Sequence, residues 1–412
     1  LRELILTDLE DAFALPRWAR EPRSTPAQKA GTRWLREVVL SQPEGAAAEV
    51  QVGASDTAIL QYSGGTTGTP KGAIGLHRGL VANSLMFRRW LTGLEDGKES
   101  TLMAIPMYHV YGMVVGMSVS VLMGAKMVLI PDPRNLENLL RNIEVYQTSF
   151  FPGVPTMYAL INRFLDAQAG KYDLTAVRAC ISGSAPLPKE VKERFESLTG
   201  AQLMEGYGLS EAPTATHCNP MFGEKRTGSI GLPLPDVDCR IVSLEDGETD
   251  LPPGEAGELL IRGPQVMQGY HNQPEETEEA LRGGWLHTGD IARMDSDGYF
   301  YIVDRKKDMI KVSGFAVWPR EVEQIIAAHP KVLEASVAGV PDPIRGEAPA
   351  AWVVLRPGES MEPQEIIDWC KESLVYYKIP VQVEFVESLP RTLVGKVLRR
   401  ELVRRYVERR AK

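Results

Sequence analysis

Apolar positions divide most of the chain into short strand-like runs that alternate with helical patterns between residues 57 and 220. Strands are expected at 57–63, 101–109, 148–153 and 179–185. Helices are expected at 77–91, 136–143, 154–165 and 188–200. This alternation predicts an α/β fold, with a mostly parallel sheet covered by helices on both faces.

Two later regions have a different pattern. Between residues 226 and 303, clusters of turn residues separate short strands at 239–242, 258–263 and 299–303, which predicts a β-rich subdomain. After residue 304, helices at 319–329 and 362–375 mix with strands at 334–340, 350–356 and 383–388. We therefore expect a large domain over 1–304, including the β-rich subdomain 226–303, and a small α+β domain over 305–412.

Two stretches of the chain have an unusual composition. The first 56 residues are rich in Pro, Ala, Ser and Gly, so an irregular lead is expected. Residues 110–130 are almost all apolar, but Gly124, Ala125 and Lys126 divide them into a buried helix and a buried strand. Each piece is too short to cross a bilayer, so no transmembrane segment is expected.

Composition and net charge limit the kinds of protein that this chain could be. The 412 residues are 43% hydrophobic and 24% charged, with a formal net charge of −8, which is ordinary for a soluble globular protein and argues against a nucleic-acid partner. From residue 391 onward, nine Lys or Arg face only Glu401 and Glu408. This run is either the solvated face of a terminal helix or a local attraction for an anionic ligand.

Four cysteines lack the spacing of a metal knuckle or a disulfide framework: Cys180, Cys218, Cys239 and Cys370. We expect buried thiols in a reducing compartment, which points to the cytoplasm.

The stretch QYSGGTTGTPKGAIG at 61–75 has the ingredients of a phosphate loop. It is not a Walker loop, because Pro70 precedes Lys71 and Gly72 follows it. Its glycines permit close backbone approach to an anion, and its hydroxyls and lysine add donors and charge. The alternative is a flexible surface turn. We expect phosphate binding by Ser63, Gly64, Gly65, Thr66, Thr67, Gly68, Thr69, Pro70 and Lys71.

Three more stretches carry candidate chemistry. In MEGYGLSEA at 204–212, Tyr207 offers a flat face for a base and Glu211 could hold a hard cation, although a tight turn with a surface acid is the alternative. In GWLHTGD at 284–290, Asp290 could accept hydrogen bonds from two adjacent hydroxyls, or be a β-turn aspartate. In ISGSAPLP at 181–188, small residues leave room for a planar ligand, or form a helix-capping turn.

Taken in order, these motifs resemble the adenylate-forming (AMP-binding) enzyme superfamily, which includes acyl-CoA synthetases, firefly luciferase and the adenylation domains of peptide synthetases. The resemblance runs from about residue 55 to 400. The stretch 216–242 and SGFAVWPREVE at 313–323 look most like medium- or long-chain fatty-acyl-CoA synthetases. The resemblance implies an acid–thiol ligase that uses ATP, Mg²⁺ and coenzyme A, and that passes through an acyl adenylate.

The same resemblance assigns nucleotide contacts. Tyr207 would stack on adenine, Asp290 would grip the ribose, and Arg305 would contact ribose or phosphate. Glu211 would bind Mg²⁺, with Ser63 as a weaker second ligand. The remaining residues implied around the nucleotide are Gly183, Ser184, Ala185, Gly206, Gly208 and Ser210.

Catalytic and substrate roles also follow from the resemblance. Lys396 would contact the carboxylate and the α-phosphate, with Lys71 adding charge, while Lys307 would be the hinge of a mobile C-terminal lid. The segment near the pantetheine of coenzyme A would contain Lys311, Gly314, Phe315 and Ala316. The acyl group would lie against His109, Ala212 and Thr214.

Several alternatives stay open. The acid could be aryl rather than fatty, and the acceptor could be a carrier-protein phosphopantetheine. A luciferase-type oxygenase or an inactive nucleotide-binding module are further options. Family members carry a further segment before the phosphate loop, so we expect part of the N-terminal domain to be missing here. A homodimer and peripheral membrane contact are also open.

Overall fold

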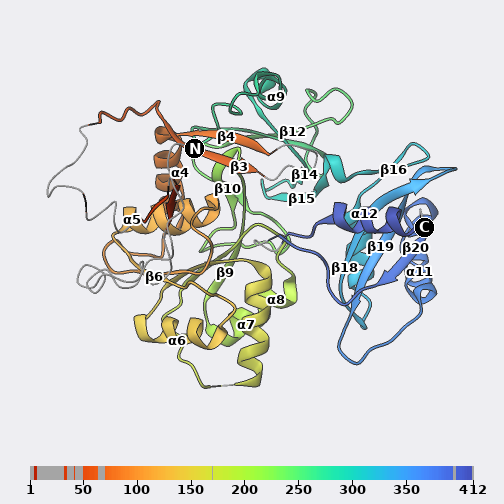
Figure 1. Cartoon of the computed structure of the whole chain (residues 1–412), viewed down its shortest axis with the longest axis horizontal. Helices are drawn as coiled ribbons and strands as arrows, with labels where there is room; N and C mark the ends of the chain where they lie inside the picture. The colour runs from red at the N-terminus through yellow and green to blue at the C-terminus, as the bar shows by residue number, and fades with distance from the viewer. Residues whose placement is uncertain are drawn as a thin grey trace. The chain divides into compact units, whose positions relative to one another are not determined.

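The computed structural model describes residues 4–6, 32–34, 41, 50–63, 70–168, 170–392 and 396–410. The chain forms two compact units, Leu1–Gly53 and Ala54–Lys412. In the first unit, β1 (Leu4–Leu6) pairs in parallel with β2 (Thr32–Trp34), so the predicted irregular lead contains two short strands. All other described helices and strands belong to the second unit, and Figure 1 labels most of them.

A seven-stranded sheet forms the centre of the second unit, in the order β11-β10-β9-β8-β7-β5-β6. The five strands from β9 to β6 run in parallel, and β10 and β11 are antiparallel additions. The α/β class with a mostly parallel sheet is thus confirmed. The strands are β5 (Ser100–Met103), β6 (Lys126–Leu129), β7 (Phe150–Gly153), β8 (Ala179–Ser182), β9 (Gln202–Leu209), β10 (Ala212–Cys218) and β11 (Leu232–Pro233).

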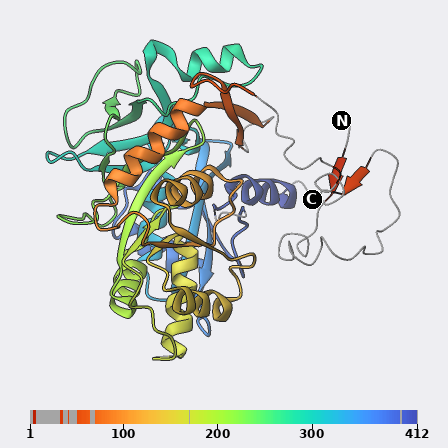
Figure 2. The same cartoon turned by 90° about the vertical axis from the view of Figure 1, so that its left-hand side faces the viewer.

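Helices cover both faces of this sheet because neighbouring strand residues point to opposite sides. Phe150 of β7 packs in one core with α4 and α5, while the adjacent Phe151 packs in a second core with α6, α7 and α8. Figures 1 and 2 show these layers, with α4 in orange and α6–α8 in yellow to green. The helices are α4 (His77–Trp90), α5 (Val119–Met123), α6 (Leu136–Tyr146), α7 (Pro155–Ala167) and α8 (Lys189–Thr199).

The apolar stretch 110–130 departs from prediction in two ways. Its helical part begins as a π-helix, η1 (Tyr111–Ser118), which continues into α5 and ends at Gly124 with a left-handed φ of 61°. Its strand, β6, was predicted to be buried, and this is wrong. β6 is at the edge of the sheet formed by the described strands, and Met127 and Leu129 are exposed while only Val128 is buried.

Two smaller sheets lie outside the central sheet, and only the second of them falls in the region 226–303 that was predicted to be β-rich. An antiparallel hairpin joins β3 (Thr57–Ser63) to β4 (Lys71–Leu76), and residues 64–69 between them lie outside the described part. A four-stranded antiparallel sheet has the order β12-β13-β14-β15. Its elements and neighbours are β12 (Asp238–Val242), β13 (Ala256–Arg262), α9 (Pro274–Ala280), η2 (Arg282–Gly284), β14 (Leu286–Met294) and β15 (Phe300–Arg305).

Residues 306–410 are called the C-terminal lobe. The described part of this lobe has an α+β structure, with its own sheet. Its order is β17-β16-β19-β18, and β20 pairs in parallel with β19. Helices α10 and α11 pack on one face, and α12 packs on the other. The elements are η3 (Lys306–Asp308), β16 (Ile310–Val312), β17 (Phe315–Val317), α10 (Pro319–Ala327), β18 (Val332–Asp342), β19 (Gly346–Leu355), α11 (Pro363–Lys371), η4 (Tyr376–Lys378), β20 (Gln382–Phe385) and α12 (Arg399–Arg410).

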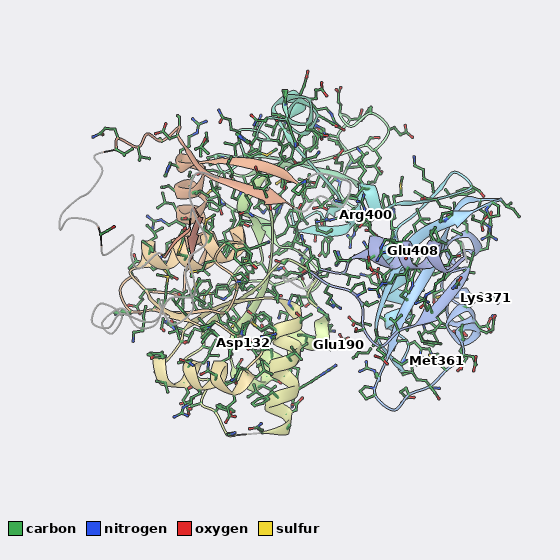
Figure 3. All side chains as sticks on the ribbon, viewed as in Figure 1. Asp132, Glu190, Met361, Lys371, Arg400 and Glu408 are labelled. Carbon is green, nitrogen blue, oxygen red and sulfur yellow. The ribbon has the colours of Figure 1, made fainter. Side chains whose placement is uncertain are left out.

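Charged residues occupy the outer faces of the helices, as Figure 3 shows for Glu190 of α8, Lys371 of α11 and Glu408 of α12. Within the described residues, the structure contains no helix with the length and apolar character needed to span a bilayer.

Candidate functional site

The predicted site residues gather beyond the carboxyl ends of the parallel strands, where α/β sheets bind ligands. Gly183, Ser184 and Ala185 follow β8, Glu211 follows β9, and His109 follows β5. The phenol of Tyr111 ties the neighbouring strand ends together, because its hydroxyl donates to Ile181 O at 2.7 Å and to Gly153 O at 3.1 Å. The end of the sheet is therefore rigidly held below the site.

Tyr207 and Glu211 belong to the β9–β10 hairpin. A side chain at Gly208 would place Cβ only 1.6 Å from Thr214 O, so the two strands can approach this closely only with glycine there. Across the hairpin, Tyr207 pairs with His217, whose ring centre lies 5.8 Å from that of Tyr207. Burial lowers the pKa of His217 to about 3, so Tyr207 is supported by a neutral ring.

Asp290 connects Tyr207 to Arg305. The Tyr207 hydroxyl donates to Asp290 Oδ2 at 2.6 Å, and Arg305 Nε lies 3.2 Å from Asp290 Oδ1. Asp290 is inside β14, opposite Arg305 on β15, so the alternative of a turn aspartate is wrong. The Asp290 carboxylate raises the pKa of Arg305 further, which keeps the guanidinium charged. Each Asp290 oxygen still has a lone pair for another donor.

A second group surrounds Glu211. The Tyr270 hydroxyl donates to Glu211 Oε1 at 3.0 Å, and Lys71 Nζ lies 5.2 Å from the centre of the Tyr270 ring. The Lys71 ammonium also forms an ion pair with Glu276 of α9. Burial and the Glu211 carboxylate raise the pKa of Tyr270, so its phenol stays protonated and donates. The phosphate-loop lysine and the candidate magnesium carboxylate therefore both interact with Tyr270.

The charge of Lys396 interacts with residues of both groups. Its side chain reaches solvent, yet the surrounding protein atoms and the nearby Arg305 and Lys307 lower the pKa of its ammonium to about 8, against the opposing pull of Asp290 and Glu211. His109 belongs to the same neighbourhood, because burial and the Lys396 charge lower its pKa. Residues from β9, β14 and β15, from the loops after β5 and β9, and from the C-terminal lobe therefore contribute to one site.

Other predicted residues lie apart from this cluster or outside the described residues. Lys311, Gly314, Phe315 and Ala316 belong to the β16–β17 hairpin, and among the described contacts none joins them to Lys396; Phe315 instead stacks on Tyr377 at 4.7 Å. Ala212 and Thr214 are buried in β10. Residues 64–69 lie outside the described residues, only the backbone of Ser63 is described, and Pro70 is exposed.

Sequence reasoning missed Tyr270, Glu276 and Asn83. Asn83 of α4 accepts from Thr214 N and Ala215 N through Oδ1, both at 3.1 Å, and donates to Ala215 O, which fixes β10 behind the hairpin. No spacing rule relates these residues to the motifs. The glycine before Tyr270 was the one available sequence signal at this position.

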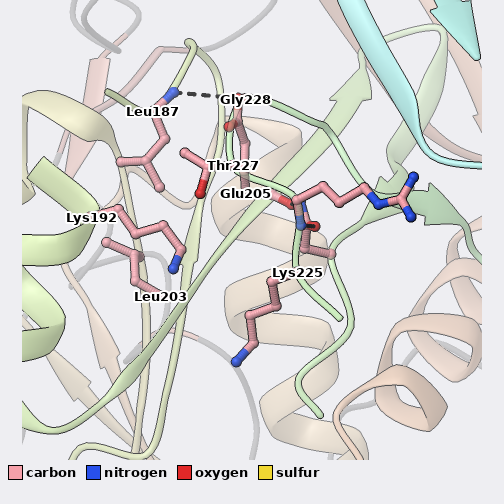
Figure 4. A pocket seen from close by; sticks show the side chains of 9 residues that line it. Leu187, Lys192, Leu203, Glu205, Lys225, Thr227 and Gly228 are labelled. Atoms are coloured by element: carbon pink, nitrogen blue, oxygen red, sulfur yellow. Dashed lines mark hydrogen bonds between the residues drawn. The ribbon is translucent and has the colours of Figure 1, made fainter. Parts of the chain in front are cut away.

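A small cavity lies beneath β9, and none of its lining residues is a predicted site residue (Figure 4). Its volume of about 10 Å³ would hold roughly one water molecule. Glu205 lines it and accepts from Leu187 N at 3.3 Å. Burial raises the pKa of Glu205 to about 7, although Arg320 and this hydrogen bond oppose the shift.

Glu205→Gln is expected to stabilise the protein at pH 8 but not at pH 4.5. The raised pKa means that ionising Glu205 in the folded protein lowers the free energy of unfolding. This loss is absent below the ordinary glutamate pKa and is complete above pH 7. We expect a gain of about 1–3 kcal/mol at pH 8, since each unit of pKa shift corresponds to about 1.4 kcal/mol. Thermal unfolding midpoints at the two pH values measure it. An equal gain at both values would contradict the role of ionisation.

Glu211 suits a magnesium ion that arrives with a nucleotide. Among the described residues there is no cluster of three potential ligands that could form an all-protein metal site. Mg²⁺ commonly binds through one or two carboxylates together with substrate phosphates. The Glu211 carboxylate, oriented by Tyr270, fits that requirement.

Comparison with known proteins gives a consistent result. Residues 7–271 match the AMP-binding enzyme family, and residues 321–396 match the AMP-binding enzyme C-terminal domain. The chain belongs to this family of adenylate-forming enzymes. It is 46% identical over 353 residues to a long-chain-fatty-acid–CoA ligase of Bacillus subtilis, covering 86% of this chain. It is 42% identical over 350 residues to the enzyme of that name from Yersinia pestis, covering 84% of this chain.

The chain spans only 62% and 61% of the lengths of these two relatives. Among solved structures, ATP-bound MatB from Rhodopseudomonas palustris aligns with a TM-score of 0.82 at 31% identity, covering 91% of this chain and 74% of that one. The o-succinylbenzoate CoA synthetase of Bacillus subtilis, solved with ATP and magnesium, aligns with a TM-score of 0.77 at 29% identity, covering 90% and 75%.

Proposed function

We propose that this protein activates a medium- or long-chain fatty acid with ATP and transfers the acyl group to coenzyme A. One observation carries the proposal: Tyr207 and Arg305 hold Asp290 between them, and the charges of Asp290, Arg305 and Glu211 act on Lys396 of the C-terminal lobe. The similarity to long-chain-fatty-acid–CoA ligases supports the choice of acid. We place the protein in the cytoplasm, where its four free thiols would stay reduced.

In the first step, a carboxylate oxygen attacks the α-phosphorus of ATP. An O–P bond forms, the bond to the β-phosphate bridging oxygen breaks, and the products are acyl adenylate and pyrophosphate. Both reactants are anions, so the main barrier for the protein to lower is electrostatic. The Lys396 ammonium supplies positive charge where the two reactants meet, and no covalent side-chain nucleophile is needed.

The other residues orient the nucleotide. Asp290, held by Tyr207 and Arg305, has acceptor capacity for the two ribose hydroxyls. The Tyr207 ring would stack on adenine, and Gly183, Ser184 and Ala185 would line the same pocket. Glu211 would hold Mg²⁺, which when bound screens the phosphate charge. Lys71 and the residues 63–70 would contact the phosphates.

In the second step, the thiol of coenzyme A attacks the acyl carbon. A C–S bond forms, AMP leaves, and the thiol proton passes to solvent. Lys396 has no role once the adenylate exists. We propose that the C-terminal lobe turns about Lys307 between the steps, which brings Lys311, Gly314, Phe315 and Ala316 toward the pantetheine. The exposure of Phe315 leaves that hairpin available for such a contact.

Exchange of labelled pyrophosphate into ATP tests the first step without coenzyme A. Octanoate, dodecanoate, palmitate and oleate should each be compared with benzoate and anthranilate. We expect exchange that depends on the fatty acid and on Mg²⁺ and is strongest with the longer chains. Binding of ATP with no exchange for any acid would favour an inactive nucleotide-binding module.

An aryl acid is the second candidate, because an anthranilate CoA ligase solved with anthranoyl-AMP aligns with a TM-score of 0.78 at 31% identity. Stronger exchange with anthranilate than with palmitate would favour it.

The acceptor is tested separately by mass spectrometry of the thioester, with free coenzyme A against a carrier protein bearing phosphopantetheine. We expect free coenzyme A to be acylated. Acylation of the carrier alone would replace that part of the proposal.

A further inference from the structure

Arg399 is the first residue of α12, three positions after Lys396. A cation in the first turn of a helix faces the positive end of the helix dipole, which is electrostatically unfavourable. Arg399 therefore needs compensation from nearby carboxylates. Its side chain is 23% exposed, so it lies largely inside the protein rather than in solvent.

Three acidic residues from separate elements provide that compensation. Arg399 Nη2 donates to both Glu323 oxygens at 2.9 Å, and Nη1 donates to Asp308 Oδ2 at 2.8 Å. Asp304 Oδ1 lies 3.8 Å from Nη1. These carboxylates raise the pKa of Arg399, so the guanidinium stays charged. We call the group Arg399, Glu323, Asp308 and Asp304 the Arg399 cluster.

The Arg399 cluster lies around the segment that links the C-terminal lobe to the rest of the second unit. Asp304 is the last but one residue of β15, directly before Arg305, and Asp308 follows Lys307. Asp304 also accepts from Arg320 N at 2.7 Å and Arg305 N at 2.8 Å. Glu323 is fixed in turn by Val337 N at 2.8 Å. The beginning of α12 is therefore tied to residues on both sides of Arg305 and Lys307.

Lys396 itself has few contacts that could hold its position. Its backbone contacts are all within one local turn: Thr392 N donates to Lys396 O at 2.8 Å, Lys396 N donates to Thr392 Oγ1 at 3.1 Å, and Leu398 N donates to Pro390 O at 2.8 Å. Among the described residues, no carboxylate forms an ion pair with its ammonium. The nearest strongly anchored side chain along the chain toward α12 is Arg399.

We propose that Arg399 is a positioning residue for Lys396: its cluster with Glu323 and Asp308 holds the Lys396 turn against Asp290, Arg305 and Glu211. The inference rests on the proposed function. Only the guanidinium fork can bind both oxygens of Glu323 and reach Asp308 at the same time, which the single ammonium of lysine cannot reproduce. The geometry of the first half-reaction thus depends on a residue that contacts no substrate.

The test compares Arg399→Gln and Arg399→Lys with a matched control, Arg405→Gln. Arg405 is also in α12, but it is exposed and pairs with Glu401 of the same helix. Arg399→Gln should lower kcat for fatty-acid-dependent pyrophosphate exchange by about 10²-fold, the typical cost of a 1 Å misplacement. The KM for ATP should change little. Arg399→Lys should be intermediate, and Arg405→Gln should match the wild type.

Thioester formation from supplied acyl adenylate and coenzyme A separates positioning from general damage. Because Lys396 is not used in that step, Arg399→Gln should retain it within about threefold, well inside the spread expected from indirect effects. Equal loss in both half-reactions, or a wild-type exchange rate in Arg399→Gln, would overturn the proposal.

A readout that needs no activity distinguishes this inference from the proposed function. Lys396 is labelled by an amine-selective reagent across pH, and the labelled peptide is quantified by mass spectrometry. In the wild type the midpoint should be near pH 8, set by burial and by Arg305, Lys307, Asp290 and Glu211. In Arg399→Gln it should rise toward the ordinary lysine value of about 10.4 as Lys396 leaves them. An unchanged midpoint would overturn the positioning role, even if the wild type showed no exchange.

Discussion

Lys396→Ala is expected to lower the rate of adenylate formation by about 10²–10³-fold, the usual cost of removing a group that stabilises developing charge. The KM for ATP should change little, because the proposed nucleotide contacts, such as Asp290 and Tyr207, lie outside the C-terminal lobe. Thioester formation from supplied acyl adenylate should remain near the wild-type rate. Pyrophosphate exchange and the adenylate-to-thioester assay measure the two steps separately.

The pH dependence provides the control for this variant. With a pKa of about 8, Lys396 loses its charge as pH rises, so the adenylation rate in the wild type should decline above pH 8. Lys396→Arg retains a charge at all working pH values and should move that decline upward, although its different geometry lowers the maximum. Equal loss of both half-reactions in Lys396→Ala would remove Lys396 from its proposed role.

Lys307→Pro is expected to have the opposite effect. Proline fixes φ near −65° and removes the N–H, so the backbone at residue 307 could no longer make the large change that domain rotation requires. We expect adenylate formation within about threefold of the wild type and thioester formation reduced by about 10²-fold or more, as for other hinge-dependent steps.

Lys307→Ala is the matched variant, since it removes the same charge and leaves the backbone free. It should keep most of the thioester activity. If Lys307→Ala and Lys307→Pro lose the same step equally, the lysine charge rather than backbone rotation is responsible. If Lys307→Pro loses both steps equally, the hinge proposal is wrong.

Motifs predicted the candidate site better than its supporting contacts. Asp290 and Arg305 are assigned by the short stretches around them, and the fold places them opposite one another on β14 and β15. Their roles stay proposals. Tyr270 and Glu211 are 59 residues apart, and Arg399 and Glu323 are 76 apart. Such pairs depend on how the sheets and lobes pack, which no local pattern contains.

The error at β6 has the same origin. KMVL is as apolar as a central strand, and composition cannot tell whether a second strand will lie on its other side. The π-helix at Tyr111–Ser118 was equally invisible, because its apolar residues lack a clear period. By contrast, Phe150 and Phe151 point to opposite cores as the two-residue period of a strand requires.

Transfer of oxygen-18 tests the central claim most directly. Palmitate labelled in its carboxylate is incubated with the protein, ATP, Mg²⁺ and coenzyme A, and the released AMP is analysed by mass spectrometry. If the carboxylate attacks the α-phosphorus at the site formed by Lys396, Asp290 and Glu211, each AMP formed should carry one labelled oxygen. Label found in inorganic phosphate with ADP as the product, or AMP that contains no label, would contradict the account.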